Sequence, residues 1–97
     1  MLTIEHVSEN ELKLAGRFDA SQAEKATVEL SRYHGSITID MEALDYISSM
    51  GLSVLVQTYK RLNEKGFGVR LANLNNHVRD VFKFTRLDQI FDIVEPG

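Results

Sequence analysis

The sequence predicts an α/β fold: a mixed, mostly parallel sheet of about five strands, with an N-terminal antiparallel hairpin and three main helices. Two short segments with strand-like alternation open the chain, separated by only a few polar residues. Strands joined by so short a connection pair antiparallel. Segments of helical period then alternate with further strand-like segments, which is typical of right-handed crossover units around a parallel sheet.

The opening hairpin is expected at residues 2–7 and 11–16, where leucines and isoleucine alternate with polar residues. The first helix follows, with Asp19 or Ser21 as its cap and Gly35 as its end. Its apolar face is expected to hold Ala23, Ala26, Leu30 and Tyr33.

The third strand is expected at residues 36–41, which are β-branched and alternating, and residues 42–48 are expected to form a loop. The second helix is expected at about 49–65, because Gly66 follows it. Its apolar stripe would be Leu52, Leu55, Val56, Tyr59 and Leu62.

A short strand is expected at residues 69–72, and a third helix follows with Asn75 or Asn76 as its cap. That helix would direct Val78, Val81, Phe82 and Thr85 to one face, and Phe84 would be a half-exposed contact or a local packing residue. The last strand is expected at 90–94. No repeat or linker interrupts the pattern, so one domain over residues 1–97 is predicted.

The composition of the 97 residues limits the classes of function. A net charge of -3 gives no electrostatic footprint for nucleic acid or anionic membrane. The absence of cysteine excludes disulfides and thiol catalysis and fits a cytoplasmic protein. No apolar run reaches the roughly 20 residues that span a bilayer, so membrane insertion is not expected. A monomer is the default expectation.

Two serines stand where the second helix is expected to begin, and they have two interpretations. Serine is a preferred N-cap, so both could serve the helix start alone. Alternatively, Ser48 caps the helix and Ser49 presents its hydroxyl to solvent at the positive end of the helix dipole, a position suited to a phosphoserine. Gly51 costs the helix about 1 kcal/mol relative to alanine. We interpret it as leaving room for a partner chain or a phosphate.

Two aspartates are expected at the ends of neighbouring parallel strands, close to these serines. Asp19 and Asp40 either satisfy loop N–H groups or accept the serine proton or bind a metal during phosphoryl transfer. The three histidines have no metal-ligand spacing, and no phosphate-binding loop or nucleophile motif occurs. We therefore expect no cofactor, no metal and no enzymatic activity.

Four segments together resemble a known family. They are residues 16–19 (GRFD), 39–41 (IDM), 46–55 (YISSMGLSVL) and 78–91 (VRDVFKFTRLDQIF). They look like a STAS domain and, more narrowly, a bacterial anti-sigma factor antagonist, and they cover nearly the whole chain in order.

The resemblance implies a partner switch in which the protein is a substrate. A serine kinase with a histidine-kinase-like ATPase fold, itself the anti-sigma factor, phosphorylates Ser49. The unphosphorylated form binds that kinase and releases the sigma factor, and a metal-dependent serine/threonine phosphatase resets the switch. The implied partner-binding residues are Asp19, Asp40, Tyr46, Ser48, Ser49, Met50, Gly51, Leu52 and Ser53.

Two features depart from the family pattern. Ser48 stands where the family usually has Asp, and Met50 replaces a hydroxyl residue, so Ser48 remains an alternative acceptor. The fourth helix that usually follows the last strand is expected to be short or absent. Two other functions stay open: a non-phosphorylated STAS subunit of an ABC-type lipid transporter, and a sensor of a small anion or nucleotide.

Overall fold

A five-stranded sheet in the order β1-β2-β3-β4-β5 forms the centre of the structure, a computed structural model that describes residues 1–94. The strands are β1 (Leu2–Ser8), β2 (Glu11–Phe18), β3 (Ile37–Ile47), β4 (Val69–Ala72) and β5 (Asp92–Val94). The first pair is antiparallel and the other three pairs are parallel. The predicted mixed sheet with an opening hairpin is confirmed.

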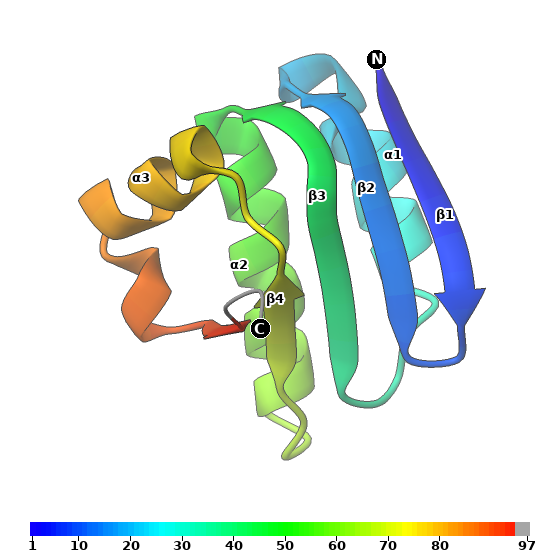
Figure 1. Ribbon diagram of the computed structural model, residues 1–97. Coiled ribbons are helices and arrows are strands. Elements are labelled where there is room, and N and C mark those ends of the chain that lie inside the picture. Colours follow the sequence, from blue (N-terminus) through cyan, green and yellow to red (C-terminus); the bar gives the residue numbers. More distant parts are fainter. Residues whose placement is uncertain (95–97) are drawn as a thin grey trace.

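Three α-helices and two short 3-10 helices connect the strands. They are α1 (Ala23–Leu30), α2 (Ser49–Asn63), α3 (Asn76–Phe84), η1 (Ala20–Gln22) and η2 (Leu87–Gln89). Figure 1 shows α1 and α2 behind the sheet, while no helix lies in front of β1 to β4. Within residues 1–94, no helix is long and apolar enough to span a membrane. The expectation of a short or absent fourth helix concerns residues 95–97 and lies outside the described residues.

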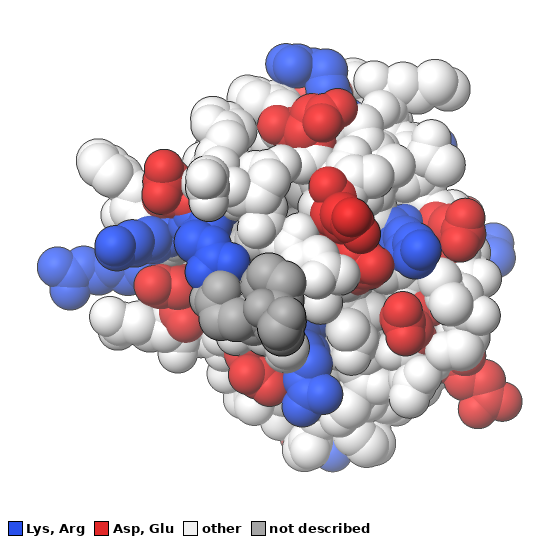
Figure 2. Space-filling view, in the orientation of Figure 1, with Lys and Arg blue, Asp and Glu red and all other residues white. Residues whose placement is uncertain are grey.

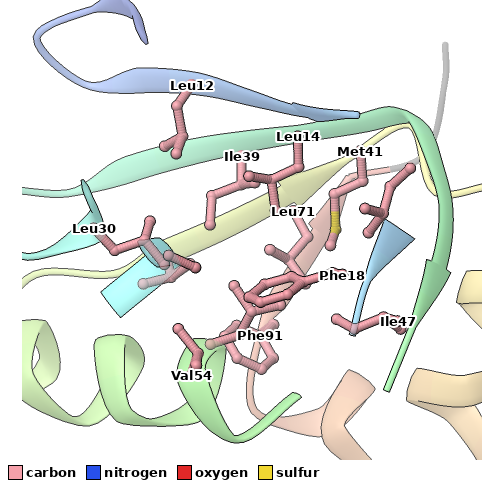
Figure 3. Packing of buried hydrophobic residues seen from close by; sticks show 14 of the residues in the cluster. Leu12, Leu14, Phe18, Leu30, Ile39, Met41, Ile47, Val54, Leu71 and Phe91 are labelled. Carbon is pink, nitrogen blue, oxygen red and sulfur yellow. The ribbon is translucent and has the colours of Figure 1, made fainter. Parts of the chain in front are cut away.

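The core lies between the sheet and the helices behind it. Figure 3 shows side chains from β2, β3 and β4 packed against others from α1 and α2. Each fully buried leucine or isoleucine stabilises the fold by roughly 1.5–3 kcal/mol. This packing holds α2 along the sheet, with its first turn beside the carboxyl end of β2. The central members are Leu12, Leu14, Leu30, Ile39, Met41, Val54 and Leu71.

Strand β3 continues to Ile47, so the predicted loop over residues 42–48 is wrong for all but Ser48. Residues 43–47 pair with β2, but the register shifts twice along this pairing. Each shift breaks the two-residue alternation, which leaves Glu42 and Ala43 both exposed and spaces the buried Met41, Leu44 and Ile47 three apart. A strand with that spacing does not show the period on which strand prediction rests.

His6 joins β1 to the segment around α1. Its Nε2 lies 2.7 Å from Glu29 Oε2, and its Nδ1 lies 2.6 Å from the hydroxyl of Tyr33. Because an ionised carboxylate only accepts hydrogen bonds, Nε2 donates, and in the neutral imidazole Nδ1 accepts from Tyr33. Burial, followed by the charge of Glu29, raises the pKa of Tyr33 and keeps its hydroxyl protonated. His6 therefore has a structural role.

Gly16 is the point where β2 passes the start of the chain. Its φ is +91°, and an added Cβ would lie 2.2 Å from the carbonyl oxygen of Met1. The same carbonyl accepts a hydrogen bond from the N–H of Arg17 at 3.0 Å. Glycine is therefore required here by both the backbone conformation and the close approach.

We expect Gly16→Ala to lower the free energy of unfolding by about 1–2 kcal/mol from the positive φ alone, and by more from the overlap with Met1. Gly35→Ala is the matched control, because a Cβ at Gly35 would meet no atom within 4 Å. Urea unfolding measures both changes. Equal stability of the two variants would contradict the close approach at Gly16.

Candidate functional site

Ser48 caps helix α2. It is the residue before the first helical position, with φ -89° and ψ 172°, and its Oγ accepts a hydrogen bond from the N–H of Gly51 at 3.2 Å. Its carbonyl accepts from the N–H of Leu52 at 2.9 Å. The hydroxyl of Ser48 is thus half-buried and engaged, as the capping interpretation of this serine predicts.

Ser49 is the first residue of α2, and its side chain is exposed. No hydrogen bond of its hydroxyl occurs among residues 1–94, so capping explains one serine of the pair and leaves the other available. The free N–H groups of a helix start carry a partial positive charge, which favours a negative group there. The exposed neighbours on the same helix are Ser53 and Met50, of which Met50 is 50% exposed.

The first turn of α2 is packed tightly against the end of β2. The N–H of Ser48 donates to the carbonyl of Phe18 at 2.9 Å. A Cβ at Gly51 would lie 2.9 Å from that carbonyl oxygen and 2.9 Å from Cγ1 of Ile47. The interpretation that Gly51 leaves room for a partner is therefore wrong: the glycine is buried and allows the helix to approach Phe18.

Leu52 also belongs to the interior, because only 8% of it is exposed and it is part of the hydrophobic core. The side chain of Leu52 is therefore not part of the exposed surface at the predicted partner site, and the buried Gly51 has no side chain. The exposed surface at the start of α2 consists of Ser49, Met50 and Ser53.

Asp19 serves the short helix η1. Its Oδ1 accepts hydrogen bonds from the N–H of Ser21 at 3.1 Å and from the Ser21 hydroxyl at 2.5 Å. The hydrogen bond from the Ser21 hydroxyl is the main cause that lowers the pKa of Asp19 below its ordinary value. Asp19 is thus a weak base with an engaged carboxylate, which favours the loop-capping interpretation over a role in accepting the serine proton.

Asp40 does not lie beside the serines, so the prediction that it ends its strand is wrong. It pairs with Lys13 and Ala72 in the interior of β3, which continues to Ile47. Its Oδ1 accepts from the N–H of Glu42 at 2.9 Å and from Asn73 Nδ2 at 3.3 Å. Among the described residues, no group of three acidic or histidine side chains could hold a metal ion.

Arg17 and Tyr46 form a pair that the sequence interpretation missed. They are register neighbours on β2 and β3, and the guanidinium carbon of Arg17 lies 4.3 Å from the centre of the Tyr46 ring. Such a cation–π contact at an exposed site stabilises by about 0.5–1 kcal/mol. The pairing depends on the extension of β3, so no sequence period indicated it.

Helix α3 also reaches this end of the sheet. Its cap, Asn75, accepts from the N–H of Val78 at 2.8 Å and donates to the carbonyl of Leu44 on β3 at 2.8 Å. Of the two expected caps, Asn75 and Asn76, the structure shows that Asn75 is the cap. At the other end of α3, Phe84 is 91% exposed, which is more than the half-exposed contact or the local packing role that were expected.

Comparison with known proteins identifies the family of this chain. Residues 4–96 match the STAS domain family. The chain belongs to this family. It is 30% identical over 91 residues to the anti-sigma-B factor antagonist of Bacillus subtilis, covering 89% of this chain and 84% of that protein. It is 32% identical over 84 residues to BtrV of Bordetella bronchiseptica, covering 82% of this chain and 72% of BtrV.

Solved structures of the anti-sigma factor antagonist SpoIIAA have the same fold. The unphosphorylated form superposes with a TM-score of 0.72 at 16% identity, covering 100% of this chain and 90% of SpoIIAA. The phosphorylated Bacillus form superposes with a TM-score of 0.73 at 18% identity, covering 100% of this chain and 92% of that one. At this identity the likeness concerns the fold.

The different positions of the two serines predict different effects on stability. Ser48→Ala removes the cap and should lower the free energy of unfolding by roughly 1 kcal/mol. Ser49→Ala changes an exposed hydroxyl and should stay within about 0.5 kcal/mol of the parent chain. Urea unfolding of the two variants measures the difference, and a larger loss for Ser49→Ala would contradict the assignment of Ser48 as the cap.

Proposed function

We propose that the chain is an anti-sigma factor antagonist that works by partner switching in the cytoplasm, and that phosphorylation of Ser49 inactivates it. The observation that carries this proposal is the arrangement at the start of α2. Ser48 engages its hydroxyl in the cap, while Ser49 presents a free, exposed hydroxyl one residue later. The relatedness to the Bacillus subtilis antagonist supports the same function.

The phosphoryl donor and the catalytic groups come from the partner, a serine kinase with a histidine-kinase-like ATPase fold. The γ-phosphoryl group of ATP passes to Oγ of Ser49, ADP leaves, and the hydroxyl proton goes to a base of the kinase. Asp19 is a poor candidate for that base, because Ser21 already donates two hydrogen bonds to its carboxylate. Magnesium accompanies the nucleotide in the kinase, so this chain supplies only the acceptor and the docking surface.

The unphosphorylated surface suits close contact with a protein. Met50 gives it an exposed apolar side chain, and Ser49 and Ser53 are small neighbours that permit close approach. A phosphate on Ser49 adds nearly two negative charges to that contact. Repulsion and desolvation of the phosphate then weaken the complex, and a metal-dependent serine/threonine phosphatase restores it.

The chain should accept one phosphate when it is incubated with such a kinase from the same organism, ATP and Mg²⁺, and tandem mass spectrometry should locate it on Ser49. Ser49→Ala should abolish phosphorylation and still bind the kinase in a pull-down. Ser53→Ala is the matched control, because Ser53 is another exposed serine of α2 and should leave phosphorylation of Ser49 intact.

Two results would count against the proposal in different ways. A phosphate that survives Ser49→Ala and disappears in Ser48→Ala would move the acceptor to Ser48. Failure of both the parent chain and Ser49→Ala to bind any kinase of this class would reject partner switching as the function.

A further inference from the structure

We propose that Arg17 and Tyr46 form a preorganised binding element for a carboxylate, and that this element selects a kinase with an aspartate or glutamate opposite it. The inference rests on the proposed function, because the partner it concerns is the kinase that phosphorylates Ser49. It adds the chemical identity of one contact in that complex.

The position of the guanidinium is fixed by the sheet. Arg17 is exposed near the carboxyl end of β2, and Tyr46 is half-buried at the matching position of β3. The guanidinium carbon of Arg17 lies 4.3 Å from the centre of the Tyr46 ring. Figure 2 shows basic atoms beside acidic atoms at the top of the view, at the end of the sheet where Figure 1 places the carboxyl end of β2. An arginine held on a ring loses less conformational entropy on binding than a free one.

The planar fork of the guanidinium suits an anionic group with two oxygen atoms. Among residues 1–94 the guanidinium of Arg17 donates no hydrogen bond, so the five N–H donors of its planar fork are available to a ligand. A carboxylate matches that fork with two parallel hydrogen bonds. Within residues 1–94, no carboxylate lies within ion-pair distance of Arg17. The charge of Arg17 contributes to the lowered pKa of the nearby Asp19, but the main partner of that carboxylate is Ser21.

The element lies at the same end of the molecule as the phosphorylation site. Phe18 follows Arg17 directly, and its carbonyl accepts the hydrogen bond from the N–H of Ser48. Tyr46 precedes Ser48 by one intervening residue. In the proposed complex the partner that covers Ser49 extends to Arg17 at this end of the sheet, and a phosphate on Ser49 repels the carboxylate that binds Arg17.

Isothermal titration of the chain into the cognate kinase tests the element, with every variant made in the Ser49→Ala background so that no phosphate is transferred. Arg17→Ala should weaken binding about tenfold to hundredfold, which is the effect of losing a charged hydrogen-bond pair. Arg17→Lys should weaken it about fivefold to tenfold, because lysine keeps the charge without the planar fork. Arg32→Lys is the matched control, because Arg32 is an exposed arginine beyond the end of α1 and outside the proposed surface, and it should bind within about twofold of the parent.

The salt dependence gives a second readout that a purely structural role would not change. Binding of the parent should weaken as salt rises, and Arg17→Ala should reduce that dependence. If Arg17→Lys binds as tightly as the parent, the proposed pairing of the guanidinium with a carboxylate is rejected, while the proposed function stands. If the Ser49→Ala parent does not bind the kinase, both proposals fail. Thermal melts check that each variant is folded. If Arg17→Ala is unfolded, Arg17→Lys compared with Arg32→Lys still tests the proposal.

Discussion

The hydrogen bond from the N–H of Ser48 to the carbonyl of Phe18 joins the end of β2 to the beginning of α2, and the arrangement of the candidate site depends on it. It places the first turn of α2 against the sheet, where only a glycine fits at position 51. Ser48 then turns its hydroxyl back to cap the helix, and Ser49 faces outward. The exposed serine is therefore held on a rigid junction rather than on a mobile loop.

In the proposed function, this packing allows a single phosphate to act as a switch without unfolding the domain. The buried side of the junction, formed by Phe18, Ile47, Gly51 and Leu52, belongs to the hydrophobic core. The outer side carries the hydroxyl, the exposed Met50 and the stacked Arg17. A charge added to the outer side alters what a partner meets while the core packing stays in place.

Much of the fold could be predicted from the sequence, because most strands and helices keep their periods and α2 has a clear cap. The second half of β3 could not, since two register shifts space its buried residues three apart. That error placed Asp40 at the end of its strand, although it lies in the interior of β3, and it hid the pairing of Arg17 with Tyr46. The role of Gly51 could not be predicted either, because a helical glycine that is needed for close packing and one that exposes backbone look the same in a sequence.

Comparison of the backbone amide NMR spectra of the unphosphorylated chain and the chain phosphorylated on Ser49 tests the central claim most directly. We predict shift changes confined to the start of α2 and the facing end of β2, with the amide signal of Gly51 retained in its capping hydrogen bond. Changes spread through the sheet, or loss of the protected Gly51 amide, would contradict a switch that works by added charge on a preformed surface.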